Sequence, residues 1–528
     1  MHIRPSFRPA GWALLLFILL PLLLSAQYVR HSSFGSEQQR RMQYALDDWI
    51  SYLGAREFGN IAAGPKYLYF ATLDGGIWRY HIYDNYWDYP YTTSNGLPDN
   101  RVEKVAYDPE SGLLWAFTPD DEAVFNFASE EWLSKSEASY WPYRLSEPDN
   151  NEQRGGKEQF YGREALDNLP GIFANGDFSI LTDWILMDRD FQEFPIDGYL
   201  RDRYDRLWMP VKGFGIGEAE LYTQRADFYR MGLPAIEPRA IAYQGDDIWI
   251  GGIARGDGGL PGIARWPYQG PGWDYFRARF ISRLPSDNVN DIAIQGDSVW
   301  FATDYGVSLY DSGNDRWSNY NLDKGLISND VSDVEILGRY LYAATDQGIS
   351  RLSLLSGGVE RIKERRFINL PFYRLAAQGD TLWAATFRGI YRYSDQSAEW
   401  QLVPARAAIS DLEITAVGTY GDEIWFASSS GIMRLDRRSG EWESFPQIGF
   451  EIRPPYRDIQ VNSAAVWVAT PDGLLKFDKE RRYWRLFDTS DGLLSNNCRR
   501  LLLDGDYIWI VSDAGITQFY WNNPQRSD

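Results

Sequence analysis

Few side chains in this sequence could do catalytic chemistry. Histidine occurs only three times, at His2, His31 and His81. Because His-rich metal sites and Ser-His-Asp triads depend on histidine, neither is expected here. The sequence also contains no G-x-S-x-G, no H-E-x-x-H and no glycine loop of the kind that cradles phosphate. An activated serine and a zinc-bound water are therefore poor candidates for the chemistry of this chain.

Carboxylates are the remaining catalytic candidates, since the chain has 73 Asp and Glu residues. Asp120, Asp121 and Glu122 form an acidic run that could bind Ca²⁺. A solvated turn is the simpler interpretation, and no cofactor is expected. Pairs of carboxylates also catalyse the cleavage of glycosidic bonds. A glycan-cleaving enzyme, either a glycosidase or a lyase, is therefore kept as the alternative function.

The charge of the chain restricts its partners. The formal net charge is −20 at pH 7, and the isoelectric point is near 4.7. Nucleic acids and anionic membrane surfaces bind basic surfaces, so neither is expected as a partner. The single cysteine, Cys498, cannot form an intrachain disulfide, and we interpret it as a small buried hydrophobic residue.

The elements that would position a site are set by an internal repeat. Residues 292–331 contain four short apolar runs separated by turn residues, which predicts four consecutive antiparallel strands, A to D. The second run, Val299 to Ala302, is apolar on both faces, so it must be buried between two neighbours. Its aromatic residue recurs at spacings of 51, 42, 41, 42, 42 and 42, at Trp249, Trp300, Tyr342, Trp383, Trp425, Trp467 and Trp509. This period predicts an all-β fold, a β-propeller of four-stranded antiparallel blades.

About eleven such units are expected along the chain. The seven regular units from Trp249 to Trp509 would form a seven-bladed C-terminal ring, preceded by a looser N-terminal set of blades. The last unit lacks a clear strand D. The segment at Trp49 and the segment at Phe228 both match that strand, and the sequence leaves the choice open. One continuous ring system, or one that shares strands, is the alternative.

The first 26 residues have the three parts of a secretory signal peptide. Arg4 and Arg8 precede an apolar run from Trp12 to Leu24, and cleavage is expected after Ala26. A secreted or periplasmic protein without a membrane span is therefore expected, and an uncleaved anchor is the alternative. The expected division of the chain is a signal peptide at 1–26, N-terminal blades at 27–226 with an insertion at 134–169, and the C-terminal ring at 227–528.

The repeated motif resembles the two-component regulator propeller repeat. It stands here as VWFATDYGVSLYD, LWAATFRGIYRYS, IWFASSSGIMRLD and VWVATPDGLLKFD. The resemblance implies a periplasmic sensor module of the kind found in hybrid two-component proteins, many of them linked to glycan utilisation. The units are also similar to the PorZ-type propellers of the type IX secretion system. From this sequence we expect no membrane span, kinase or receiver segment after the last blade, and no separate sorting domain.

Candidate ligand-binding residues come from one face of the expected propeller. The connections from strand B to C and from strand D to A lie on that face, where ligands usually bind. Two insertions fall there, and they carry aromatic, acidic and Arg side chains that suit sugar recognition. The candidates are Tyr140, Trp141 and Tyr143 in the insertion at 134–169, Arg255 and Asp257 in a second insertion at 254–262, and Asp304, Tyr305, Asp346, Gln347, Phe387, Arg388 and Asp472 in the ordinary B to C turns.

These observations favour an exported, non-enzymatic propeller. It would bind a glycan, a peptide or a protein through the loop-rich face, either as a sensing module or as an accessory of cell-surface export. Long loops are also tolerated at little cost without any function, so the insertions alone do not separate a site from a neutral surface. The sequence leaves the ligand and the oligomeric state open.

Overall fold

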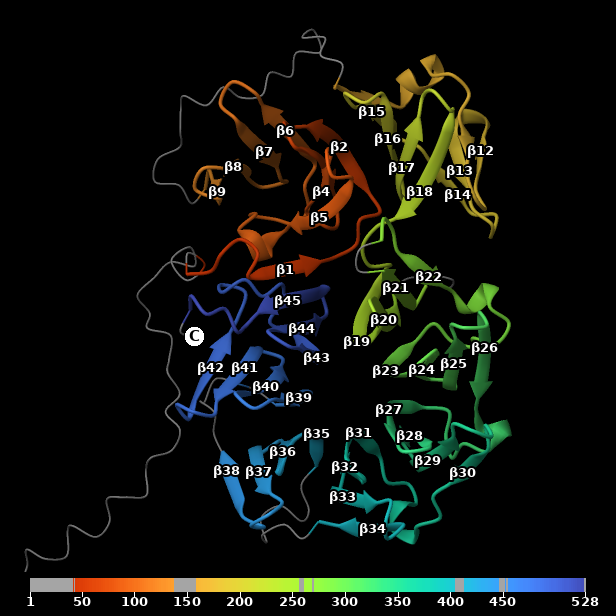
Figure 1. The fold of residues 1–528 in the computed structure, drawn as a ribbon, viewed down its shortest axis with the longest axis vertical. Coiled ribbons are helices and arrows are strands. Elements are labelled where there is room, and N and C mark those ends of the chain that lie inside the picture. The colour runs from red at the N-terminus through yellow and green to blue at the C-terminus, as the bar shows by residue number, and fades with distance from the viewer. Residues whose placement is uncertain are drawn as a thin grey trace, which may run out of the picture.

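The protein is described from a computed structural model, in residues 41, 43–136, 158–255, 261–267, 270–403, 413–445, 452 and 454–526. Within these ranges the strands form eleven sheets, most of them four-stranded and antiparallel (Figure 1). The prediction of an all-β, multi-blade propeller is confirmed. The helical elements are short 3₁₀ turns: η1 (Thr93–Asn95), η2 (Arg163–Asn168), η3 (Thr182–Trp184), η4 (Ala278–Phe280), η5 (Leu322–Lys324) and η6 (Arg365–Phe367).

Seven four-stranded blades form the C-terminal ring. Their inner strands pack in chain order from β19 to β43, and β43 packs back against β19, so the ring is closed. Six blades are continuous in sequence: β19 (Ile236–Gln244), β20 (Asp247–Ala254), β21 (Ile263–Pro267) and β22 (Asp274–Phe276); β23 (Val289–Gln295), β24 (Ser298–Thr303), β25 (Gly306–Asp311) and β26 (Arg316–Tyr320); β27 (Val331–Leu337), β28 (Tyr340–Thr345), β29 (Gly348–Ser353) and β30 (Val359–Arg361); β31 (Phe372–Gln378), β32 (Thr381–Thr386), β33 (Gly389–Ser394) and β34 (Glu399–Leu402); β35 (Ile414–Tyr420), β36 (Glu423–Ser428), β37 (Gly431–Asp436) and β38 (Trp442–Phe445); β39 (Asp458–Val461), β40 (Ala465–Thr470), β41 (Gly473–Asp478) and β42 (Tyr483–Phe487).

The seventh blade takes its outer strand from the beginning of the described chain. It consists of β43 (Cys498–Asp504), β44 (Tyr507–Ser512), β45 (Ile516–Tyr520) and β1 (Trp49–Tyr52). β1 pairs antiparallel with β45, with Trp49 opposite Phe519, and the two rings stack at a centroid distance of 3.8 Å. The segment at Phe228 lies instead in β18, which pairs with β17. Of the two closing strands that the sequence leaves open, the one at Trp49 closes the ring.

The N-terminal sheets lie on the other side of β1. Two are blades of four strands: β2 (Phe58–Ala63), β3 (Tyr67–Thr72), β4 (Ile77–His81) and β5 (Tyr86–Tyr91), then β6 (Lys104–Asp108), β7 (Leu113–Phe117), β8 (Glu122–Asn126) and β9 (Glu131–Ser134). A three-stranded sheet has β12 (Ser179–Leu181), β13 (Ile185–Met187) and β14 (Glu193–Pro195). A six-stranded sheet has the order β10 (Phe160–Gly162), β15 (Gly198–Arg201), β16 (Arg206–Val211), β17 (Gly215–Glu220), β18 (Arg225–Arg230) and β11 (Phe173–Ala174).

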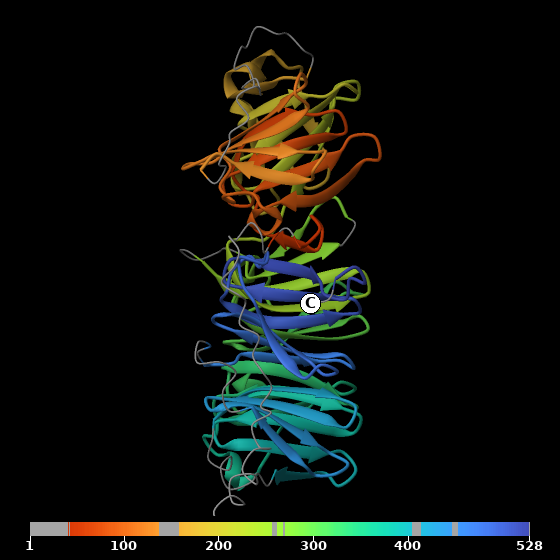
Figure 2. The same cartoon turned by 90° about the vertical axis from the view of Figure 1, so that its left-hand side faces the viewer.

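These pairings differ from the expected division of the chain at residue 227. That boundary falls inside β18, and Trp49–Tyr52 belongs to a sheet of the C-terminal ring. The chain crosses between the two halves at residues 53–57 and again at residues 231–235. The crossings are tied together, because Leu233 N–H donates to the Leu53 carbonyl at 2.9 Å and Gly54 forms a bridge with Gly232. Figure 2 shows the halves stacked along the long axis of the molecule.

Blade interfaces are filled by aromatic residues of the B strands. In β24, Val299, Phe301 and Ala302 are fully buried and Trp300 is 3% exposed, so both faces of the strand are covered. Trp249 of the preceding blade contacts Phe301, with ring centroids 5.7 Å apart. The same arrangement buries the other B-strand aromatics of the ring. Cys498 is also fully buried, as its interpretation as a hydrophobic residue requires.

A substitution at Trp49 tests the closure of the ring. Trp49 is 1% exposed and packs on Phe519 and Phe487, so Trp49→Ala should lower the free energy of unfolding by about 3–5 kcal/mol. Chemical denaturation followed by tryptophan fluorescence and circular dichroism measures this. Tyr305→Ala, at an aromatic that is 49% exposed, is the control and should cost less than about 1 kcal/mol. Equal effects of the two substitutions would contradict the closure by β1.

Candidate functional site

The B to C turns of the ring share one local structure. At the end of β24 the Thr303 hydroxyl donates to the carbonyl of Gly306 at 2.7 Å and accepts from the N–H of Tyr305 at 3.1 Å. Gly306 has a φ of +102°, and a Cβ there would lie 2.1 Å from the Tyr320 carbonyl oxygen, so only glycine fits. Thr345, Thr386, Ser428 and Thr470 make the same bond to a glycine three residues later. The turns therefore hold their variable residues in a fixed frame.

The predicted ligand-binding residues that the structure describes are distributed around this face. Tyr140, Trp141, Tyr143 and Asp257 lie outside the described residues. Each of the others comes from the turn of a single blade: Asp304 and Tyr305 between β24 and β25, Asp346 and Gln347 between β28 and β29, Phe387 and Arg388 between β32 and β33, Asp472 between β40 and β41, and Arg255 directly after β20. Tyr305 and Phe387 are 49% and 47% exposed.

Some of these side chains also have structural partners. Asp304 accepts hydrogen bonds from Ser286 and, at 2.7 Å, from Asn288 in the connection that leads into its own blade. Asp513 binds Ser495 and Asn497 in the same way at 2.7 and 2.8 Å. Arg255 donates to the Asp513 carbonyl at 2.8 Å. The face remains a candidate surface, and Asp304 and Arg255 help to shape it.

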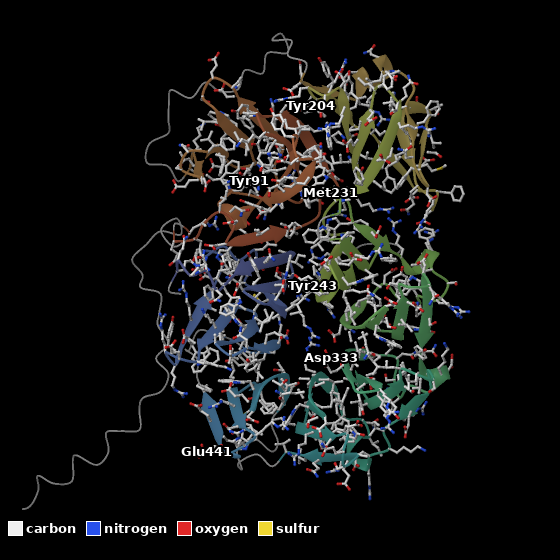
Figure 3. The ribbon with its side chains drawn as sticks, viewed as in Figure 1. Tyr91, Tyr204, Met231, Tyr243, Asp333 and Glu441 are labelled. Atoms are coloured by element: carbon white, nitrogen blue, oxygen red, sulfur yellow. The ribbon has the colours of Figure 1, made fainter. Side chains whose placement is uncertain are left out.

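Three carboxylates lie near the ring axis, where they accept backbone N–H groups and bind Arg500. Asp291, Asp333 and Asp458 occupy equivalent positions on inner strands, and each accepts the N–H of the next blade, at Val334 (3.1 Å), Leu375 (2.7 Å) and Leu501 (2.8 Å). Arg500 binds all three, with Asp333 at 3.0 Å and Asp458 at 4.0 Å. Figure 3 shows Asp333 near the middle of the ring. These carboxylates are committed to joining the blades.

Two acidic groups in the centre of the ring, Asp291 and Glu335, have raised pKa values. Burial raises the pKa of Asp291 to about 7, because the attraction of Arg500 only partly offsets burial and the repulsion from Asp333. Burial, followed by the charges of Asp333 and Asp291, raises the pKa of Glu335 to about 8. Near neutral pH the ring axis therefore carries fewer negative charges than its count of carboxyl groups suggests.

A pocket of about 410 Å³ lies among hairpin tips of the N-terminal half. Its walls come from three turns, β4–β5, β15–β16 and β17–β18. The lining residues are Ile82, Tyr83, Asn85, Tyr204, Asp205, Arg206, Glu220, Leu221 and Tyr222. Figure 3 shows Tyr204 at the junction between the β2–β5 blade and the six-stranded sheet. These turns join strands A to B and C to D, so they lie on the face opposite the one that the sequence favours.

Buried polar contacts fix the shape of the tips. Asp202 is fully buried and accepts from the N–H of Tyr204 at 2.9 Å, the N–H of Arg206 at 3.0 Å and the indole N–H of Trp208 at 3.0 Å. Arg203 joins the two sheets, because it donates to the Gly64 carbonyl at 3.0 Å and to the Tyr83 hydroxyl at 2.9 Å. The tyrosines of the pocket are therefore held by folded sheets.

The pocket combines exposed rings with polar groups of both signs. Tyr83, Tyr204 and Tyr222 are 50%, 52% and 98% exposed. Arg206 lies over the Tyr204 ring at 5.6 Å and donates to the Asn85 side-chain oxygen at 2.9 Å. The Arg206 guanidinium also pairs with Asp202 at 2.8 Å and Glu218 at 3.2 Å, and its second terminal nitrogen is buried without a hydrogen-bond partner among the described residues. Ring faces for stacking beside amide, carboxylate and guanidinium groups can bind a polyhydroxylated ligand.

Sequence reasoning did not identify this pocket. A signal was present in the A to B turns, because those of the C-terminal ring include small and polar pairs such as Gly296–Asp297 and Gly379–Asp380, whereas the β15–β16 turn carries Tyr204. Tyr83 and Tyr222 lie in C to D turns, at positions that a hairpin does not bury. The sequence could not predict that the β2–β5 blade and the six-stranded sheet lie on opposite sides of the pocket.

The acidic run at residues 120–122 is occupied by internal contacts. Asp121 accepts hydrogen bonds from Ser134 and Ser136, which hold its pKa below the usual range although burial opposes them. Glu122 pairs with Lys135 at 2.9 Å. Among the described residues, no group of three His, Cys, Asp or Glu side chains is arranged to hold a metal ion. No helix in the same ranges is long and apolar enough to cross a membrane.

The raised pKa of Glu335 predicts a pH dependence of stability. Its pKa is about 8 when folded and near 4.5 when unfolded, so the folded state keeps a proton that the unfolded chain releases. The free energy of unfolding should therefore fall as the pH rises from about 5 to 9. Glu335→Gln should reduce this fall by about 1–3 kcal/mol in urea denaturation at pH 5, 7 and 9. Glu360→Gln, at an exposed carboxylate, is the control; identical slopes in all three proteins would contradict the assignment.

No family model and no curated protein sequence matches the chain. Among solved structures it is similar to the extracellular domain of BT4673 from B. thetaiotaomicron (14% identity, TM-score 0.46, 89% of this chain and 71% of that one). It is also similar to PorZ of Porphyromonas gingivalis (12%, 0.34, 90% and 87%) and to YCF48 from Cyanidioschyzon merolae (14%, 0.42, 55% and 97%).

Proposed function

We propose that this chain is an exported propeller module that binds a saccharide in the pocket formed by Tyr83, Tyr204 and Tyr222. The observation that supports the proposal most is the gathering of three exposed tyrosine rings around one cavity. An exposed aromatic on a hairpin tip contributes nothing to the core. Three of them on tips that meet across two sheets form a recognition surface.

The charges of the pocket favour a neutral ligand. Asp205 and Glu220 are negative and Arg206 is positive, and Arg201 pairs with Asp205 at 2.8 Å. A strongly charged ligand of either sign would therefore meet repulsion from part of the wall. Sugar hydroxyl groups both donate and accept hydrogen bonds, so they can use Asn85, the carboxylates and the guanidinium together, while C–H faces stack on tyrosine.

Export and biological role follow from the amino-terminal segment and the repeat. The expected signal peptide at residues 1–26 supports a secreted or periplasmic location. The repeat supports a sensing module or an accessory of cell-surface export, and in both roles the propeller would present a ligand or a partner to another protein.

The proposal is tested by glycan binding. Tyr222 is 98% exposed, so Tyr222→Ala should leave thermal stability unchanged while it weakens oligosaccharide binding by about three- to tenfold, the equivalent of one lost stacking contact. A glycan array identifies the ligand, and calorimetric titration measures the change. The products are analysed for cleavage in the same incubation, because cleavage would favour the enzyme alternative.

A matched pair of controls separates this pocket from the opposite face. Tyr305→Ala and Phe387→Ala remove aromatics that are 49% and 47% exposed from the B to C turns. Both variants should bind saccharide like the wild type. If they lose binding and Tyr222→Ala keeps it, the ligand site lies on the loop-rich face and the pocket assignment is wrong.

A further inference from the structure

Four arginines lie on inner strands at the face of the ring that carries the B to C turns. They are Arg239 in β19, Arg374 in β31, Arg457 directly before β39 and Arg499 in β43; we call them the arginine tier. Each stands near the start of its inner strand, and that start pairs with the end of strand B, as Val289 of β23 pairs with Thr303 of β24. The tier therefore lies toward the face with the variable turns. Arg374 has the register position of the Asp291 and Asp333 carboxylates, and the other three arginines stand one residue earlier in their strands.

Arg239 and Arg457 each feel the positive charge of Arg499. Burial lowers the pKa of Arg239, and the charges of Arg499 and Arg374 lower it further, against the pull of Glu237. Burial and Arg499 likewise lower the pKa of Arg457. The four positive charges come from blades one, four, six and seven, so they approach from several sides of the ring axis.

Only two of the four arginines, Arg374 and Arg499, form a salt bridge with a carboxylate within the described residues. Glu237 pairs with Arg499, and Asp333 accepts from Arg374 at 3.2 Å. Asp333 is shared with Arg500, which also holds Asp291 and Asp458. Arg239 and Arg457 donate to the neutral side chains of Asn290 at 3.1 Å and Asn497 at 2.5 Å. Two of the four guanidinium groups therefore have neutral hydrogen-bond partners in the described structure.

The tier also keeps hydrogen-bonding capacity. The Nε atoms of Arg239, Arg374 and Arg499 are buried and have no hydrogen-bond partner within the described ranges. The side chains of Arg374 and Arg499 are each 20% exposed, so other atoms of these side chains face solvent on this side of the ring. A guanidinium group presents paired donors that match the oxygens of carboxylate, sulfate and phosphate.

We propose that the arginine tier is a second binding site, which takes an anionic group (a carboxylate, a sulfate or a phosphate) on a ligand that approaches the B to C face. The chain as a whole carries a charge of −20 and repels anions, so an excess of arginine at one place on the ring marks where an anion is accepted. The site is independent of the tyrosine pocket, which lies in the other half of the molecule and on hairpin tips.

Sulfate is the probe for the experiment, titrated against the full chain at constant ionic strength with chloride as the replaced anion. Arg239→Gln can still donate to Asn290 and should weaken sulfate binding by about five- to twentyfold, as expected for the loss of one charged hydrogen-bonding group. Arg388→Gln is the charge-matched control, because Arg388 is exposed on a B to C turn of the same face. It should change sulfate affinity by less than about twofold, since exposed charges are screened.

A third variant changes binding in the opposite direction. Glu237→Gln removes the carboxylate paired with Arg499, so sulfate should bind more tightly than in the wild type, by about three- to tenfold. Tyr222→Ala should bind sulfate like the wild type. Weaker binding in Glu237→Gln, or equal losses in Arg239→Gln and Arg388→Gln, would overturn the proposal. Thermal unfolding in chloride checks that each variant is folded, and the gain expected for Glu237→Gln cannot arise from unfolding.

Discussion

The ring depends on middle strands that are apolar on both faces. A strand such as β24, with Val299, Phe301 and Ala302 fully buried, can leave water only if a sheet covers each side of it. In a closed ring of seven blades, every blade has a neighbouring blade on both sides, so no blade exposes an apolar face. The outer edge of β45 would still be open, and β1 covers it with Trp49 stacked on Phe519. Architecture and closure are thus consequences of the same burial requirement.

The centre of the ring obeys a different requirement. The inner strand of each blade faces the ring axis, where no further strand can pair with it. Its buried backbone N–H and C=O groups on that side therefore need other hydrogen-bond partners. Side chains of the neighbouring blade provide them: Asp333 accepts the Leu375 N–H, and Asn290 and Ser332 donate to the carbonyls of Val331 and Phe372. Charged residues gather at the axis for this reason. A carboxylate cluster in a propeller centre is therefore not by itself a sign of catalysis.

Much of the fold could be predicted because its determinants are local. The alternation of apolar runs and turn residues, and the aromatic in each B strand, are visible within about 40 residues. The closing strand could not be chosen, because the segments at Trp49 and Phe228 carry the same aromatic pattern and the decisive partner, Phe519, is remote in sequence. The tyrosine pocket escaped for a similar reason: Tyr83 and Tyr222 become neighbours only when two sheets pack. From the sequence, Asp304 was expected only as a ligand-binding residue, but it also accepts a hydrogen bond from Asn288 in the connection before its own blade.

The strand exchange that closes the ring also sets an order of events. Ser51 and Thr517, which share a hydrogen bond at 2.7 Å in the closing blade, are 466 positions apart. β1 is made first and must wait, unpaired, until the last residues have been synthesised and have emerged. In a protein delivered across a membrane amino-terminus first, the ring can be sealed only after translocation is complete, and its contact order favours slow folding. Closure of the ring therefore requires β45 to be available for pairing with β1.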